Sequence, residues 1–147
     1  MTVLVDTGVL YADHDTDAAR HETASDALEA VYDGALGAAY ITDYIYDEAV
    51  TLTFKRTGST SAAKRIGRRL RGADPYPVAY ELLYVSDAGF AAAVEAFERY
   101  DDQDLSFTDA STVALQDRHD IDGVLSFDDD FDGVLDRIDP NDIGSES

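Results

Sequence analysis

Short runs rich in β-branched residues alternate with longer stretches of helical spacing along the whole sequence. The runs typical of strands are residues 2–5, 38–41, 78–85, 123–127 and 134–138. The stretches typical of helices are residues 16–33, 43–57, about 61–71, 87–100 and 107–119. Strands that are separated by helices pair in parallel through crossover connections. The sequence therefore predicts an α/β fold, a three-layer sandwich in which helices flank both faces of a central, mostly parallel sheet of four to five strands.

The length and composition are those of one folded domain. The chain has 147 residues, 45% of them hydrophobic, and no cysteine, which excludes disulfide frameworks, cysteine nucleophiles and Cys-ligated metals. We expect a single domain over residues 1–139 and a frayed, polar C-terminal tail over residues 140–147. No apolar run reaches the roughly 18 residues of a membrane span, and the first residues lack the basic start of a signal peptide. We therefore expect a cytoplasmic protein without a membrane partner.

The charge is strongly acidic: 31 Asp and Glu residues stand against 11 Lys and Arg residues, and the formal net charge is −20. Such a balance ordinarily argues against a nucleic-acid partner. The acidic residues are spread along the sequence, however, and we interpret them as a halophilic adaptation to molar salt. Because the Debye length at about 1 M salt is about 3 Å, only local clusters of charge bear on the choice of partner.

Four acidic residues lie where the predicted fold would place a site. Asp6 and Asp128 each follow an apolar run, and parallel sheets bind ligands at the carboxyl ends of their strands. Glu48 lies at the margin of the apolar face of its helix, where a carboxylate needs partners. Asp109 comes three residues after Ser106, as in a capping box. The alternatives are a surface acid for Asp6 or Asp128, an arginine partner or a solvent-facing position for Glu48, and a plain helix cap for Asp109.

Convergence of these four carboxylates would create a site for a hard cation. Two unit charges about 4 Å apart repel by about 4 kcal/mol at an effective dielectric of about 20, so such a group takes up protons or binds a divalent ion. Oxygen ligands alone select Mg²⁺ or Mn²⁺. The predicted chemistry is metal-assisted hydrolysis of a phosphodiester bond, and Glu48 is the preferred residue to orient or deprotonate the attacking water.

Four segments resemble the successive motifs of PIN-domain ribonucleases. They are Leu4–Leu10, the helix that contains Glu48, Leu105–Ala110 and Val124–Phe131, and together they span about residues 2–138. Their order and spacing are most similar to the VapC-type toxins of toxin–antitoxin pairs. The resemblance implies a PIN-like fold, a Mg²⁺-dependent endoribonuclease that cleaves RNA, a homodimer, and a small antitoxin protein as inhibitor.

The same resemblance implies roles for the four acidic residues. Asp6 and Asp109 would be the principal Mg²⁺ ligands, and Glu48 and Asp128 would complete the catalytic, metal-binding pocket. Asp130 is an alternative to Asp128, because aspartates crowd together in residues 128–132.

A basic stripe is the second pointer to function. Arg65, Arg68 and Arg69 fall at i, i+3 and i+4 of a predicted helix and so share one face. We predict that they bind the backbone of the RNA substrate. The alternative is a solvated helix face that neighbouring acidic residues neutralise.

Two other functions remain open from the sequence. A non-catalytic module of the same fold would bind RNA or a protein and use its acidic residues for solubility and helix caps. A calcium-binding module would use residues 128–139, in which Asp128, Asp130, Asp132 and Asp139 nearly meet the EF-hand spacing. A strand-like run precedes that loop and Pro140 follows it, so the flanking helices of an EF-hand are not expected.

Overall fold

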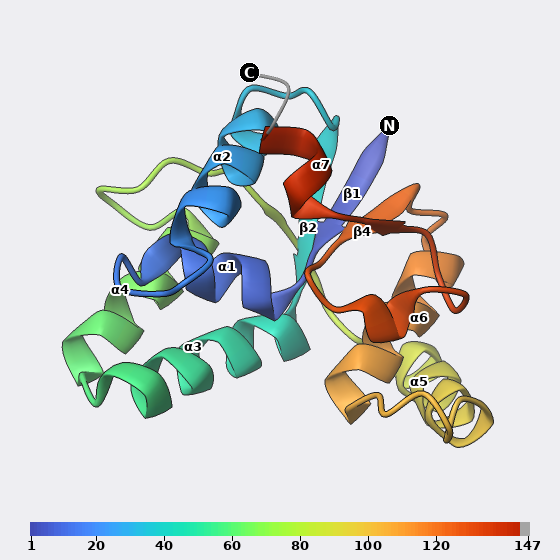
Figure 1. Cartoon of the computed structure of the whole chain (residues 1–147). Coiled ribbons are helices and arrows are strands. Elements are labelled where there is room, and N and C mark those ends of the chain that lie inside the picture. Colours follow the sequence, from blue (N-terminus) through green and yellow to red (C-terminus); the bar gives the residue numbers. More distant parts are fainter. Residues whose placement is uncertain (145–147) are drawn as a thin grey trace.

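A five-stranded sheet forms the centre of the fold (Figure 1). The computed structural model describes residues 1–144. The strands lie in the order β3-β2-β1-β4-β5, and every neighbouring pair is parallel. Their bounds are β1 (Thr2–Val5), β2 (Ala38–Thr42), β3 (Glu81–Leu83), β4 (Gly123–Leu125) and β5 (Arg137–Ile138). This arrangement confirms the predicted α/β fold with a central parallel sheet.

Helices cover both faces of the sheet. Figure 1 shows the first two helices on one side and the fifth and sixth on the other. The short last helix packs against the second. The bounds are α1 (Thr7–His14), α2 (His21–Tyr32), α3 (Asp43–Thr57), α4 (Thr60–Arg71), α5 (Asp87–Arg99), α6 (Phe107–Arg118) and α7 (Pro140–Gly144), with a 3-10 turn at Asp129–Phe131. None of the helices in residues 1–144 combines the length and apolarity that crossing a membrane requires.

The core lies around β1, the middle strand. Val3, Leu4 and Val5 are all fully buried, because β2 and β4 pair with both edges of this strand and helices cover both of its faces. A strand in that position needs apolar side chains on both faces, which explains the continuous apolar run at the start of the sequence.

The chain changes direction across the sheet between β1 and β4. From β1 the chain builds outward through β2 to β3, and it then returns to add β4 and β5 on the opposite side. Val5 pairs with Leu125, and the Asp6 amide donates to the Leu125 carbonyl at 3.0 Å. The residues that follow β1 and β4 therefore emerge side by side at the switch point, where open α/β sheets bind ligands.

One helix was not predicted from the sequence, and several predicted elements are shorter in the structure. A helix, α1, begins directly after β1 where none was predicted, and the predicted helix 16–33 begins only at His21. The strands predicted at 78–85 and 134–138 keep only Glu81–Leu83 and Arg137–Ile138. Both are edge strands that pair on a single side, so fewer of their residues enter the ladder.

The C-terminal segment also differs from the polar tail expected over residues 140–147. Residues 140–144 form α7, in which Pro140 is buried and Ile143 packs against the core. Proline at the first position suits a helix start because its fixed φ is already helical. The rest of the expected tail, residues 145–147, lies outside the described residues.

Candidate active site

A cavity of about 500 Å³ opens at the carboxyl ends of β1 and β4, and the four predicted acidic residues line it. Asp6 follows β1, Glu48 comes from α3, Asp109 from the first turn of α6, and Asp128 follows β4 by three residues. The structure thus brings together side chains from four elements that are distant in the sequence. Their roles in catalysis and metal binding remain predictions.

Asp6 is the most deeply placed of the four. Its side chain is only 7% exposed, and its Oδ2 accepts a hydrogen bond of 2.7 Å from the Ser126 hydroxyl. Burial raises the pKa of Asp6 to about 7; the Ser126 hydrogen bond opposes this, and the negative charges of Asp109 and Glu48 add to it. A carboxylate in this position is stable in its charged form only beside a compensating positive charge.

Ser126 links two of the acidic residues, and the sequence reasoning missed it. It is fully buried, and while its hydroxyl donates to Asp6, its oxygen accepts a hydrogen bond of 3.0 Å from the Asp128 amide. The signal in the sequence was a single hydroxyl within the otherwise apolar run 124–127. Such a hydroxyl needs a partner inside the protein.

Asp109 serves the start of α6 and also faces the cavity. The Ser106 amide donates to Asp109 Oδ2 at 3.0 Å, and the Asp109 amide donates to Ser106 Oγ at 3.1 Å, which together form the predicted capping box. Burial raises the pKa of Asp109, and the charges of Glu48 and Asp128 raise it further. The cap therefore fixes the carboxylate at the cavity wall rather than excluding it from the site.

Glu48 reaches the cavity from the second turn of α3. The Thr42 hydroxyl caps this helix by accepting from the Ile45 amide at 3.0 Å. Glu48 is half-buried, and it forms no ion pair in the part of the chain that the structure describes. The alternative of an arginine partner for Glu48 is therefore not observed.

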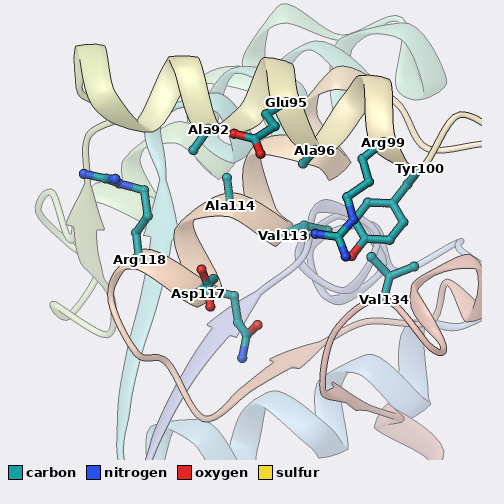
Figure 2. A pocket seen from close by; sticks show the side chains of 11 residues that line it. Ala92, Glu95, Ala96, Arg99, Tyr100, Val113, Ala114, Asp117, Arg118 and Val134 are labelled. Carbon is teal, nitrogen blue, oxygen red and sulfur yellow. The ribbon is translucent and has the colours of Figure 1, made fainter.

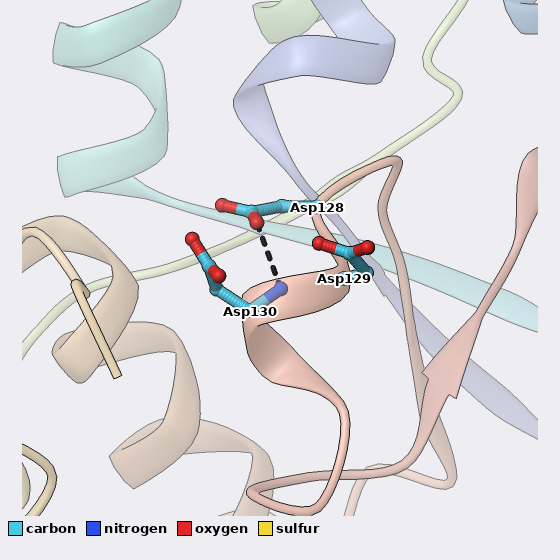
Figure 3. Close-up of side chains that lie close together, drawn as sticks. All are labelled: Asp128, Asp129 and Asp130. Atoms are coloured by element: carbon cyan, nitrogen blue, oxygen red, sulfur yellow. Dashed lines mark hydrogen bonds between the residues drawn. The ribbon is translucent and has the colours of Figure 1, made fainter. Parts of the chain in front are cut away.

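Three consecutive aspartates form a tight group beside the cavity (Figure 3). Oxygens of Asp128, Asp129 and Asp130 lie within 4.8 Å of one another, and within residues 1–144 no other group of three or more acidic or histidine side chains is that tight. Asp128 Oδ1 accepts from the Asp130 amide at 2.9 Å, and the charge of Asp128 raises the pKa of Asp130. Asp128 and Asp129 line the cavity, whereas Asp130 does not, which favours Asp128 over Asp130 as the fourth acidic residue.

The groups around the cavity fit a hard divalent cation. Carboxylate oxygens dominate the polar lining, and Arg20 is the one basic side chain that residues 1–144 contribute to it. The Thr7 hydroxyl, also in the lining, is buried without a hydrogen-bond partner within the described chain. Excess negative charge with oxygen donors alone is the chemistry that Mg²⁺ and Mn²⁺ select.

The predicted basic stripe lies away from this cavity. Arg65, Arg68 and Arg69 are carried by α4, and none of them lines the acidic cavity. Arg69 instead pairs with Asp13 at 3.4 Å and lines a separate cavity. Contact between RNA and these three arginines remains a prediction.

The loop after β4 lacks the arrangement of a calcium-binding EF-hand. Arg137 binds both carboxylate oxygens of Asp132, at 2.7 and 3.2 Å, so this aspartate is already paired. The loop runs between two strands, β4 and β5, rather than between two helices. The spacing of the aspartates thus matches an EF-hand only in the sequence.

Comparisons with known proteins identify the family and the fold. The profile of the PIN domain matches residues 3–135. VapC20 from Mycobacterium tuberculosis, described as a sarcin-ricin loop cleaving toxin, is similar with a TM-score of 0.75 and 24% identity over 89% of this chain and 93% of that chain.

Two further solved structures share the fold at lower identity. VapBC2 from Rickettsia felis, bound to a DNA fragment from its promoter, gives a TM-score of 0.68 and 9% identity over 94% of this chain and 98% of that chain. FitAcB from Neisseria gonorrhoeae gives a TM-score of 0.66 and 15% identity over 94% of this chain and 97% of that chain. No curated protein matches the sequence.

Proposed function

The chain belongs to the PIN domain family, and we propose on this basis that it is a metal-dependent endoribonuclease that hydrolyses phosphodiester bonds of RNA. One observation carries the proposal: four carboxylates from four separate elements line a single cavity at the switch point of the sheet. Burial raises the pKa of Asp6 and of Asp109, and the charges of neighbouring carboxylates add to it, so a bound cation would stabilise both residues in their charged form.

In the proposed mechanism, Asp6 and Asp109 hold Mg²⁺, for which Mn²⁺ substitutes, and Glu48 and Asp128 complete the site. When bound, the ion supplies Lewis acidity toward the phosphate and lowers the pKa of water. Glu48, which has no partner within residues 1–144, accepts the proton of the attacking water on a carboxylate oxygen. Ser126 holds the Asp6 carboxylate in place throughout.

We further propose that the protein is the toxin of a type II toxin–antitoxin pair. The likeness in fold to VapC20, a toxin described as cleaving the sarcin-ricin loop, supports this. The corresponding partners are a cytoplasmic RNA substrate, a small antitoxin that covers the acidic cavity, and a second copy of the chain in a homodimer. The net charge of −20 supports the further proposal that the protein functions in concentrated salt, as the proteins of a halophile do.

The test is RNA cleavage in concentrated KCl with added Mg²⁺ or Mn²⁺. We expect cleavage that needs the ion and that falls by at least about 100-fold in Asp6→Asn and in Asp109→Asn, because each variant removes a charged ligand of a metal that stabilises the transition state. Asp33→Asn, which alters an exposed aspartate at the end of α2, is the matched control. Circular dichroism verifies that each variant is folded.

Two results would contradict the proposal. Cleavage at the wild-type rate by both ligand variants would remove these residues from catalysis. Binding of RNA without cleavage in any divalent ion would instead indicate a non-catalytic binding module of the same fold.

A further inference from the structure

A second cavity, of about 590 Å³, adjoins the acidic one. The two cavities share four lining residues: Gly8, Arg20, Leu52 and Phe127. Beyond these, the second cavity is lined by α1, by the segment between α1 and α2, and by Arg56 in the last turn of α3. The surface therefore continues without interruption from the four carboxylates to this second depression.

Two arginines in the second cavity are held over aromatic rings. The Arg20 guanidinium lies 4.7 Å from the centre of the Phe127 ring, and the Arg56 guanidinium lies 5.8 Å from the centre of the Tyr11 ring. Neither arginine forms an ion pair with any carboxylate of residues 1–144. Stacking on a ring orients a guanidinium and leaves its N–H groups free to bind an anion.

We propose that this second cavity binds the nucleotide next to the scissile phosphate of a single-stranded RNA. The proposal rests on the proposed ribonuclease function. Arg20, at the edge that the two cavities share, contacts the adjoining phosphate, and Arg56 contacts the next. The Arg20 and Arg56 guanidinium groups, held over Phe127 and Tyr11, offer planar surfaces on which an unstacked base can stack, one of the ways in which proteins bind single strands.

The charges around the second cavity support the binding of an RNA strand there, next to the acidic cavity. Because only nearby charges act on a strand in concentrated salt, binding of RNA depends on local cations that form no ion pair with a carboxylate of residues 1–144. Arg20 and Arg56 meet that condition beside the acidic cavity. The acidic side chains of the second cavity, Asp15 and Asp17, accept hydrogen bonds from base amino groups or ribose hydroxyls.

The arginines of α4 are less suited to bind the RNA phosphates next to the acidic cavity. Arg69 is engaged by Asp13 and lies over the Tyr76 ring in a different cavity. Arg65 donates to the Ser61 hydroxyl of its own helix. Neither lines the acidic cavity or the one that adjoins it.

The experiment compares three single substitutions that each remove one stacked arginine. Arg20→Ala and Arg56→Ala alter the proposed subsite. Arg99→Ala is the matched control, because Arg99 lies over the Tyr100 ring at 5.2 Å but lines a different cavity between α5 and α6 (Figure 2). All three change the net charge equally, so a general electrostatic effect would move them together.

The probe is a short fluorescein-labelled single-stranded RNA of mixed sequence, titrated with each protein in Ca²⁺ over a range of KCl concentrations. Fluorescence anisotropy reports binding, and gels of parallel samples in Mg²⁺ or Mn²⁺ report cleavage. We expect Arg20→Ala and Arg56→Ala each to weaken binding by about tenfold. Each should also lower the slope of log affinity against log salt by about 0.7, the value for one phosphate contact on a single strand. The control should stay within about twofold of the wild type.

The outcomes separate this proposal from the proposed ribonuclease function. Equal weakening by all three substitutions, unchanged binding by Arg20→Ala and Arg56→Ala, or no binding of RNA by the wild type would each overturn the subsite. If the wild type cleaves RNA in Mg²⁺ while the two subsite variants bind it normally, the result supports the ribonuclease function and contradicts the proposed subsite. If binding depends on both arginines but no divalent ion supports cleavage, the result supports the subsite and contradicts the ribonuclease function.

Discussion

The hydroxyl of Ser126 donates a 2.7 Å hydrogen bond to Oδ2 of Asp6, a residue 120 positions earlier in the sequence. The parallel pairing of β1 with β4, in which Val5 lies opposite Leu125, places the two side by side. The same hydroxyl oxygen accepts a hydrogen bond from the Asp128 amide. Ser126 is thus a positioning residue that ties the Asp6 carboxylate to the backbone of Asp128.

Ser126→Ala should weaken the binding of Mn²⁺ by about 10- to 100-fold, the usual effect of losing a group that orients a metal ligand. Without the hydroxyl, the Asp6 carboxylate loses the hydrogen bond that favours its charged form, so its pKa rises further. Isothermal titration calorimetry with Mn²⁺ measures the change. Ser25→Ala is the matched control, because Ser25 makes a similar bond of 2.8 Å to Asp13 outside the acidic cavity. Equal affinities in Ser126→Ala and the wild type would remove Ser126 from this role.

The stability of the metal-free protein should fall as the pH rises from about 4 to about 7. Asp6 has a pKa of about 7 in the folded protein against an ordinary value of 3.8, so the folded state binds a proton more tightly than the unfolded state over this interval. The free energy of unfolding then decreases with pH, by at most about 4 kcal/mol from Asp6 alone. Asp109, whose pKa is also raised, acts in the same direction. His14, whose pKa is lowered by burial, acts in the opposite direction just below its ordinary value of 6.5, so the difference between the wild type and Asp6→Asn isolates the contribution of Asp6.

Urea unfolding in EDTA at fixed KCl and several pH values measures this dependence. Asp6→Asn should flatten it and should be more stable than the wild type at pH values above about 7, because an uncharged amide replaces the buried carboxylate. Asp132 and Asp139, whose pKa values are lowered, contribute stability that is lost only below their ordinary range, and so they act outside this interval. A wild-type stability that increases from pH 5 to pH 8 without metal would contradict the prediction.

The sequence predicted the centre of the fold well because local pattern and burial agree there. The continuous apolar run of β1 and the helix α3, with Thr42 at its start and Gly58 after its end, have signals that need no knowledge of the rest of the chain. The helix α1 was missed because its apolar and polar residues follow no clear helical periodicity. Asp6 occupies its N-cap position, but the Asp6 side chain makes no capping hydrogen bond. That carboxylate faces the cavity instead.

The places of Asp6, Asp109 and Asp128 at the cavity were predictable from strand ends and a helix start, and that of Glu48 from the margin of the apolar face of its helix. Ser126 had only a weak signal in the sequence, and Arg20 had none. Arg20 lies in a loop, and its place beside Phe127 depends on how segments more than a hundred residues apart pack together. The basic stripe on α4 was predicted to bind RNA from the spacing of its arginines alone. Spacing shows that side chains share a face of a helix but not which cavity that face meets.

Divalent ions should raise the melting temperature of the wild type and leave that of Asp6→Asn and Asp109→Asn nearly unchanged. A ligand that binds only the folded state stabilises it by about 2.7 kcal/mol at a concentration of 100 times its Kd. Differential scanning fluorimetry with MgCl₂ and MnCl₂ at constant ionic strength measures the shift. Asp132→Ala should keep the full shift, because Asp132 is bound by Arg137 and does not line the cavity. Loss of the shift in Asp132→Ala would favour the calcium-loop interpretation instead.

Asp128→Asn and Asp130→Asn should differ although only two positions separate them. Asp128 lines the cavity and contributes to the raised pKa of Asp109, whereas Asp130 lies outside the lining. We expect RNA cleavage to fall by at least about tenfold in Asp128→Asn and to change by less than about threefold in Asp130→Asn, because only the first variant removes charge from the proposed metal site. Steady-state cleavage in saturating Mg²⁺ measures both, and the Asp128→Asn amide oxygen can still accept from the Asp130 amide, which preserves the 3-10 turn. A larger loss of cleavage in Asp130→Asn than in Asp128→Asn would show that Asp130, rather than Asp128, is the fourth acidic residue of the proposed metal site.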